Sequence, residues 1–429
     1  MKTNVPEFMM GEFANQINWE KHFGLQFPLK KFDPPDWDRE NYLEEIDFNG
    51  LVNITSSLRD GMFCEIVAEY FGHYNLVYRI QFEDGVQWIA RIPLPFRLYE
   101  SLVDKKVEKR VQRYLFESMV AAQIYARIKK GVFTPAIYGA FPDSENEVGV
   151  PFILLQDMDP GLQFNENIGH FTAEKLRLIF SDLAREMISL ASPPYFTQIG
   201  CLLKKGEDYT IGPMLSGTSL EDDPIDLKKR GPYSTVQEYL ISTLNRHIAT
   251  ALREQNRQLY LQTTGLRAIV SDFIDPRFNS GPFILCPFDW EARHIYLNSK
   301  DHVCGIIDWD FATIVPVQAF FRYPPFMTRD WIVGTNSKSM EEYRKLFREC
   351  LGELQDETEL PLLELLDQSR WFQMLDEGIQ NVEVGKQVLP LLEAYVAAMR
   401  NKRVEVKAIP VVSAVPQLKQ VKGKRKVDV

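Results

Sequence analysis

The chain has 429 residues, of which 45% are apolar, 25% are charged and 12% are aromatic. This length allows a large hydrophobic core divided between more than one lobe, and this composition excludes a chain that is disordered throughout. The net charge of −10 argues against a general nucleic-acid binder. It would suit a cationic small substrate, although many proteins carry a net charge simply to remain soluble.

Five cysteines are spread along the chain, and no two of them are close enough for a CxxC pair. The sequence therefore predicts reduced thiols, with neither a zinc site nor a disulfide framework. There is no secretory signal and no run of about 18 apolar residues that would form a membrane span. These features predict a cytoplasmic protein that has no contact with a membrane.

Residues 1–60 contain several prolines and many charged residues, and we predict an N-terminal extension with short helices near 41–48 and 50–58. From Cys64 to Pro93 the hydrophobic pattern alternates with a period of two, and an Asp-Gly turn interrupts it at 84–85. This pattern predicts a three-stranded antiparallel meander.

A long helix is predicted over 104–130, with Asp104 at its start and an apolar stripe at helical spacing. The stripe consists of Val107, Val111, Leu115, Met119, Ala122 and Ala126. Strands are predicted over 133–141 and 148–155, where Pro135 confines the first of them to the edge of a sheet.

After residue 159 the chain is predicted to be mainly helical, with a strand pair over 197–213. Thr172 is the expected N-cap of the helix 173–190, and capping boxes at 234–237 and 339–342 mark two further helix starts. The predicted helices span 173–190, 234–254, 257–273, 339–354, 360–376 and 384–400. The loop between 215 and 230 holds the acidic cluster 221–223, which faces either a cationic substrate or solvent.

The tail from 401 to 429 has eight basic residues against two acidic ones and shows no periodicity. We predict that it is disordered. Its cluster at 422–426 is either a nuclear-localisation or anionic-surface patch or a solvated segment.

The stretch from 281 to 313 contains the clearest chemical signal. Two apolar runs, 282–286 and 303–307, lead to Asp289 and Asp308, and a turn at 298–301 separates them. Short strands in this order would deliver both carboxylates to one site. Phosphoryl transfer from a nucleotide needs such a pair, one to orient or deprotonate the attacking hydroxyl and one to hold Mg²⁺. The alternative is that Asp289 is a turn residue and Asp308 a strand-end cap.

The lead-in at 281–286, the position of Asp289 and the segment GIIDWD at 305–310 together resemble the aminoglycoside phosphotransferase and choline kinase-like family, in its fungal branch. This resemblance implies an α+β, protein-kinase-like fold with two lobes. The N-lobe, over 61–158, would be a small antiparallel sheet with one long helix. The C-lobe, over 159–400, would be larger and mainly helical.

The resemblance also implies roles for the residues of this stretch. Asp289 would be the catalytic base, Asp308 the principal metal ligand, and Asp310 a brace or further metal residue. Two positions depart from the family pattern: Pro287 stands where a His is expected, and His294 stands where a metal-binding Asn is expected. Because imidazole is a poorer Mg²⁺ ligand than an oxygen, the resemblance implies one metal, tolerance of Mn²⁺, or an inactive site.

Nucleotide-binding residues follow from the same resemblance. Arg91, on the third strand, would contact the phosphates, and Glu117, on the long helix, would pair with it. Gly72 would lie in the turn that covers the phosphates. The hinge that contacts the adenine would comprise Gln156, Asp157 and Met158.

The function implied is transfer of the γ-phosphate of ATP, with Mg²⁺ or Mn²⁺, to a hydroxyl group of a small molecule. Its partners would be a nucleotide and a small-molecule substrate, without nucleic acid. The competing hypotheses are a catalytically impaired pseudokinase that binds a nucleotide or a protein partner, and an interaction protein that does not use its cleft.

Overall fold

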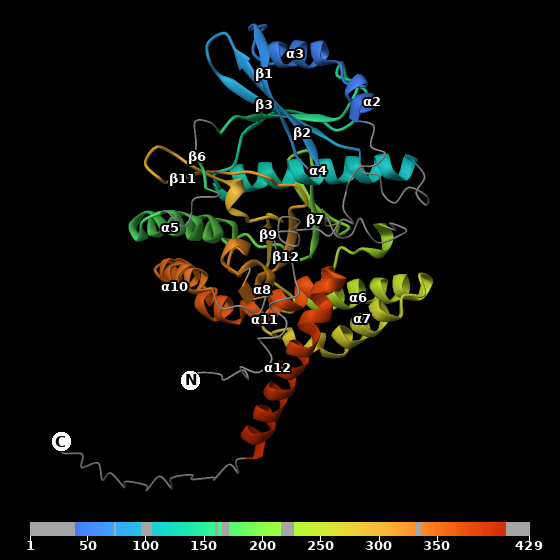
Figure 1. Ribbon diagram of the computed structural model, residues 1–429, viewed down its shortest axis with the longest axis vertical. Coiled ribbons are helices and arrows are strands. Elements are labelled where there is room, and N and C mark those ends of the chain that lie inside the picture. The colour runs from blue at the N-terminus through green and yellow to red at the C-terminus, as the bar shows by residue number, and fades with distance from the viewer. Residues whose placement is uncertain are drawn as a thin grey trace, which may run out of the picture.

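The computed structural model describes residues 39–72, 74–95, 105–158, 162–164, 171–215, 227–328, 330–331 and 337–408. A small sheet with short helices lies at one end of the molecule, and a larger, mainly helical part lies below it (Figure 1). The two-lobed α+β architecture predicted from the sequence is confirmed. No helix in the described ranges combines the length and the apolar character that crossing a bilayer requires.

The sheet of the small lobe has five antiparallel strands in the order β1-β2-β3-β5-β4. Their bounds are β1 (Cys64–Phe71), β2 (Asn75–Phe82), β3 (Gln87–Pro93), β4 (Ile137–Phe141) and β5 (Phe152–Gln156). The predicted meander is β1-β2-β3, and along β3 buried residues alternate with half-buried ones. Strand β4 lies at the edge of the sheet, as Pro135 before it indicated.

The predicted long helix is α4 (Lys105–Lys130), which lies beneath this sheet (Figure 1). Its stripe is buried at Val111, Leu115, Met119, Ala122 and Ala126, as the spacing predicted.

The described residues before β1, from 39 to 63, pack into the small lobe, whereas the prediction grouped them with an extension over 1–60. Helices α2 (Arg39–Glu44) and α3 (Phe48–Ser57) form where short helices were expected. Tyr42, Ile46 and Leu51 are buried in the same cluster as the apolar residues of β2, β3 and β5. Burial of these side chains makes the segment part of the lobe's core.

Two small sheets in the larger lobe support the loops that carry Asp289 and Asp308. One has the order β11-β10-β6 and the other β8-β7-β12-β9. The strands are β6 (Leu162–Gln163), β7 (Gly200–Lys205), β8 (Asp208–Gly212), β9 (Phe283–Cys286), β10 (Ile295–Leu297), β11 (Val303–Ile306) and β12 (Thr313–Pro316). The predicted strand pair 197–213 is β7-β8, and the two apolar runs that precede the aspartates are β9 and β11. Strand β12, which pairs with β9, was not predicted.

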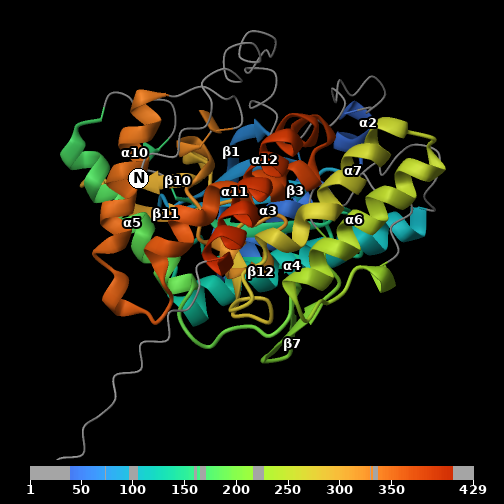
Figure 2. The ribbon, with the colours of Figure 1, turned by 90° about the horizontal axis from the view of Figure 1, so that it is seen from below.

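Helices form most of the larger lobe, which Figure 2 shows from below. They are α5 (Ala173–Leu190), α6 (Val236–Arg253), α7 (Arg257–Ile269), α8 (Val317–Phe320), α10 (Lys338–Gly352), α11 (Leu362–Gln380) and α12 (Val382–Ala408). Thr172 caps α5 as predicted. The other two predicted starts are corrected: Thr235 caps α6 and Ser337 caps α10.

The acidic cluster 221–223, Asp104 and residues 409–429 lie outside the described residues. Helix α12 runs to Ala408, so the first residues of the predicted disordered tail are helical. All five cysteines are free thiols, as predicted.

A buried carboxyl group links α5 to strand β11 through one intervening residue. The backbone N–H of Phe133 donates to Glu186 of α5 over 3.0 Å. The backbone carbonyl of the same residue accepts from the N–H of Ile306 in β11 over 2.7 Å. Glu186 is 5% exposed, and burial raises its pKa to about 7.

We expect Glu186→Gln to remove part of the pH dependence of stability. The pKa of Glu186 is raised from 4.5 to about 7 in the folded state, so the folded protein holds this proton more tightly than the unfolded chain. The contribution of Glu186 to the free energy of unfolding is therefore largest below about pH 4.5, and it falls by about 3 kcal/mol as the pH rises to 7. The variant should match the wild type near pH 4.5 and exceed its free energy of unfolding near pH 8 in urea denaturation. Parallel pH profiles of the two proteins would contradict this assignment.

Candidate active site

The β10-β11 hairpin brings the two predicted carboxylates together. Asp289 lies in the loop between β9 and β10, and Asp308 lies two residues beyond the end of β11. Ile295 pairs with Ile306 at the open end of the hairpin, and the N–H of Ile307 donates to the carbonyl of His294 over 2.9 Å. The hairpin therefore sets the residue before β10 beside the residues after β11.

His294 lies between the two aspartates. Its Nδ1 is 3.4 Å from Oδ2 of Asp289, and its Nε2 is 3.4 Å from Oδ2 of Asp308. One ligand atom from each of the three side chains lies within 4.8 Å of the others. Among the described residues this is the one group of His, Cys, Asp and Glu side chains with the spacing of a metal site.

This set of donors fits a divalent cation. It has two carboxylates and one imidazole, where a site selective for Mg²⁺ would use oxygen ligands throughout. Imidazole suits Zn²⁺ better than Mg²⁺, and Mn²⁺, a transition-metal ion, tolerates it better than Mg²⁺ does. Asp310, a predicted metal residue, lies outside this group of three.

The backbone around Asp308 is held in an uncommon conformation. Asp308 has a φ of 65° and Phe311 a φ of 58°, in the left-handed region that favours glycine. The indole of Trp309, 1% exposed, donates to the carbonyl of Ile306 over 3.1 Å and anchors the turn from inside the core. Such conformations cost about 1–3 kcal/mol and persist where the surrounding structure imposes them. Here the result is that Asp308 faces the site while its neighbour is buried.

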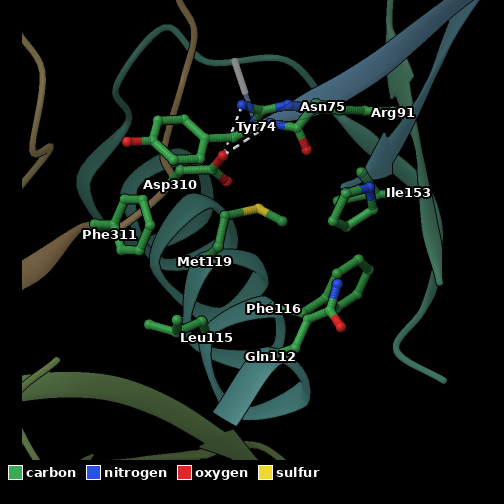
Figure 3. A pocket seen from close by; sticks show the side chains of 11 residues that line it. Tyr74, Asn75, Arg91, Gln112, Leu115, Phe116, Met119, Ile153, Asp310 and Phe311 are labelled. Atoms are coloured by element: carbon green, nitrogen blue, oxygen red, sulfur yellow. Dashed lines mark hydrogen bonds and ion pairs between the residues drawn. The ribbon is translucent and has the colours of Figure 1, made fainter. Parts of the chain in front are cut away.

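The side chain of Arg91 extends from β3 to the loop at 307–311, which carries Asp308 and Asp310 and is called the metal loop below; Figure 3 shows Arg91 and Asp310. Its Nη2 donates to Oδ1 of Asp308 over 2.9 Å and to Oδ2 of Asp310 over 2.8 Å. The amide of Asn75 also donates to Oδ2 of Asp310, over 3.0 Å. Asp310 thus braces the loop by holding two side chains of the small lobe. No motif in the sequence pointed to a role for Asn75, which is the first residue of β2.

The carboxylates of the site differ in their ionisation. Burial raises the pKa of Asp289 to about 6, although His294 and Arg293 oppose the shift. Burial also raises the pKa of Asp310. At Asp308 burial acts in the same direction, but Arg91 and His294 outweigh it, and the pKa lies below its ordinary value. Asp308 is therefore the carboxylate held most firmly in its charged form.

The predicted pair between Arg91 and Glu117 is absent from the structure. Glu117 is 45% exposed and pairs with Arg113 over 2.8 Å on the outer face of α4. The face of α4 that lines the pocket beside Arg91 presents Gln112, Phe116 and Met119 (Figure 3). Among the described side chains of α4, none that lines this pocket is acidic, and Arg91 pairs with Asp308 and Asp310.

Gly72 directly follows β1 and lies three residues before Asn75. Its N–H donates to the carbonyl of Asn75 over 2.9 Å, which closes the turn between β1 and β2. A Cβ at Gly72 would lie 3.3 Å from that carbonyl oxygen, which explains why a small residue stands there. Through Asn75 the turn is connected to Asp310 and hence to the metal loop.

The predicted hinge follows β5, and its side chains make structural contacts. The N–H of Gln156 donates to the carbonyl of Ala136 over 2.8 Å. Asp157 pairs with Nε of Arg79 over 2.7 Å. Met158 packs on Gly305, where an added Cβ would lie 2.4 Å from its methyl carbon. The backbone N–H of Gln156 is thus engaged within the sheet.

The loop at Asp289 is braced by its own residues, and the chain has Pro287 where the resemblance predicted a His. Oδ1 of Asp289 accepts from the N–H of Glu291 over 3.2 Å, and Oδ2 accepts from Nη2 of Arg293 over 2.6 Å. The N–H of His294 donates to the carbonyl of Glu291 over 2.9 Å. These bonds keep the carboxylate in place without a histidine at 287.

No family model and no curated protein sequence matches the chain. Among solved structures it is similar to a thermostable mutant of aminoglycoside phosphotransferase APH(4)-Ia, with a TM-score of 0.45, 12% identity and coverage of 82% of this chain and 98% of that one. It is also similar to ADP-bound aminoglycoside phosphotransferase APH(2'')-Ib, with a TM-score of 0.45, 11% identity and coverage of 80% and 97%. A third is macrolide 2'-phosphotransferase type I, with a TM-score of 0.41, 13% identity and coverage of 82% and 96%. Sequence identities of 11–13% concern the fold alone and say nothing about activity.

Proposed function

We propose that the protein transfers the γ-phosphate of ATP to a hydroxyl group of a small molecule. The observation that supports this most directly is the convergence of Asp289, His294 and Asp308 on one point, with Arg91 beside it. A base, a cation site and a phosphate-binding cation are the parts that phosphoryl transfer requires.

Each residue has a role in this reaction. The carboxylate of Asp289 accepts the proton of the acceptor hydroxyl, whose oxygen attacks the γ-phosphorus as the bond to the ADP oxygen breaks. Burial raises the pKa of Asp289 to about 6, which brings its basicity nearer to the working pH. Arg91 contacts phosphate oxygens with its planar guanidinium. Asp308 and His294 would hold a divalent cation, which neutralises charge on the phosphates when it is bound.

Two measurements test this function. ATP with Mn²⁺ should raise the melting temperature of the protein, since a ligand that binds only the folded state stabilises it. ATP consumption should then appear in a screen of hydroxyl-bearing metabolites. The absence of any nucleotide-dependent shift would exclude the proposal and favour an interaction protein.

A pseudokinase is the second candidate, and two observations favour it. Arg91 is engaged by the same carboxylate that would hold the metal, and His294 occupies a metal-ligand position. This candidate predicts a thermal shift with ATP but no consumption of ATP with any acceptor.

His294→Asn should change the metal preference of the site. An amide oxygen is a harder ligand than imidazole, so the variant should gain affinity for Mg²⁺ and lose affinity for Mn²⁺. Titration calorimetry with each ion in the presence of ATP would measure the ratio of the two affinities. His302→Asn is the matched control, because His302 pairs with Asp182 over 2.9 Å outside the site. An unchanged ratio in the His294 variant would remove this residue from the metal site.

A further inference from the structure

The loop at 287–294, which carries Asp289 and is called the catalytic loop below, presents a positive charge to solvent. Among its charged residues, Glu291 is 2% exposed, and the side chains of Asp289 and His294 are 12% and 11% exposed. The side chain of Arg293 is 47% exposed. The backbone beneath it is fixed, because the side-chain amide of Gln163 donates to the carbonyl of Arg293 over 2.7 Å. A half-exposed guanidinium on a fixed backbone is therefore what an acceptor meets at the loop.

Arg293 also contacts the carboxylate oxygen that would accept the hydroxyl proton in the proposed reaction. Its Nη2 lies 2.6 Å from Oδ2 of Asp289. The other oxygen of this carboxylate accepts from the N–H of Glu291. A hydroxyl group that is to give its proton to Oδ2 must therefore approach beside the guanidinium or displace it.

We infer that the acceptor carries an anionic group, a carboxylate or a phosphate, close to the hydroxyl that is phosphorylated. This inference rests on the proposed function and names the class of its second substrate. An anionic group would take Arg293 as a bidentate partner and draw it away from Asp289. A polycationic acceptor would bring like charge against the guanidinium, which is unfavourable at contact distance.

The step balances without a further reagent. The hydroxyl proton of the acceptor passes to Oδ2 of Asp289, the acceptor oxygen forms a bond to the γ-phosphorus, and the bond between that phosphorus and ADP breaks. Arg293 exchanges the carboxylate of Asp289 for the anionic group of the acceptor and keeps its charge throughout. The products are ADP and a phosphorylated hydroxy acid or sugar phosphate.

The net charge of the whole chain would favour a cationic substrate instead. The charges nearest to the bound acceptor, however, have the larger effect on its binding. Charges separated by more than about 8 Å are largely screened at physiological ionic strength. Arg293 is in contact with the carboxylate that the hydroxyl must reach, so its sign outweighs that of distant surface residues.

Matched acceptors test the inference. ATP consumption with Mn²⁺ would be measured for D-glycerate, D-gluconate and glycerol 3-phosphate against glycerol, D-sorbitol, D-glucosamine and kanamycin. At least one anionic acceptor should exceed its uncharged or cationic counterparts in kcat/KM. The inference is overturned if a neutral or cationic acceptor is the best substrate, or if such acceptors are turned over and no anionic one is. Binding of ATP without turnover of any acceptor is the result that the pseudokinase predicts, and it would overturn the proposed transfer reaction. Loss of the thermal shift with ATP would also overturn the proposed function.

Variants at Arg293 separate recognition from folding. Arg293→Gln should raise KM for the anionic acceptor by about 10- to 100-fold, the effect of losing charged hydrogen bonds, and should change KM for ATP little. Arg293→Lys should recover part of the loss because the charge remains. Arg348→Gln is the control, since Arg348 is 44% exposed and pairs with Asp367 on the surface. An unchanged KM for the anionic acceptor in Arg293→Gln would also overturn the inference.

Discussion

Asp289→Asn should abolish ATP consumption while leaving the binding of ATP intact. The amide cannot accept the hydroxyl proton, and loss of a positioned base typically costs about 100- to 10,000-fold in rate. The loop should keep its shape because the side-chain oxygen of Asn can still accept from the N–H of Glu291, which donates to Asp289 over 3.2 Å. Turnover and the ATP-induced thermal shift would be measured on the same preparation.

Asp367→Asn is the control for this change, because it removes a carboxylate that is 49% exposed and paired with Arg348 away from the site. It should leave turnover and binding at wild-type values. Full activity in Asp289→Asn would show that another group accepts the proton. Loss of binding together with turnover would mean that Asp289 acts mainly in holding the loop.

Asp308→Asn should remove most of the affinity for the divalent cation. It replaces the carboxylate that is proposed to hold the cation with His294 by a neutral amide. It also frees Arg91, whose Nη2 lies 2.9 Å from Asp308, to pair with Asp310 alone. We expect affinity for Mn²⁺ to fall by about 100-fold or more, because loss of a group that only orients a metal ligand already costs about 10- to 100-fold.

Calorimetry with Mn²⁺ alone, and then with ATP present, measures this effect without depending on catalysis. The affinity for metal-free ATP should stay the same or rise, because Arg91 has lost a competing partner. Affinity for Mn²⁺ equal to that of the wild type would contradict the assignment of Asp308 as a ligand.

Local patterns in the sequence were enough to predict the supports of the site. The alternation over residues 64–93 predicted the meander, and the apolar runs before Asp289 and Asp308 predicted strands β9 and β11. The approach of the two carboxylates followed from placing Asp289 in the loop before one short strand and Asp308 at the end of the next. These features depend on side-chain periodicity, which a single sequence contains.

The error at Glu117 has a geometric cause. The buried stripe of α4 includes Leu115 and Met119, and a residue midway between them points to the other side of a helix with 3.6 residues per turn. The predicted stripe therefore already placed Glu117 on the solvent side, where it pairs with Arg113. The family resemblance outweighed this signal in the prediction.

Other features depend on contacts that no local pattern contains. Asn75 and Asp310 are 235 residues apart in the chain, so their hydrogen bond could not be read from either segment. The burial of Tyr42 and Leu51 under the sheet likewise depends on how distant segments pack. Proline-rich sequence before them suggested an extension, whereas the helices that follow complete the core of the small lobe.

The hold of Asn75 and Arg91 on Asp310 has a consequence for how the molecule opens. Both donors come from the sheet and the acceptor comes from the larger lobe, so Asp310 joins the two lobes beside the pocket, and Asp308 adds a second link through Arg91. The two lobes can separate at this point only if these bonds break together. The attraction between Arg91 and Asp310 weakens as ionic strength rises. The nucleotide is therefore expected to enter faster in concentrated salt than in dilute buffer. Simple attraction between Arg91 and an anionic nucleotide would give the opposite dependence on salt.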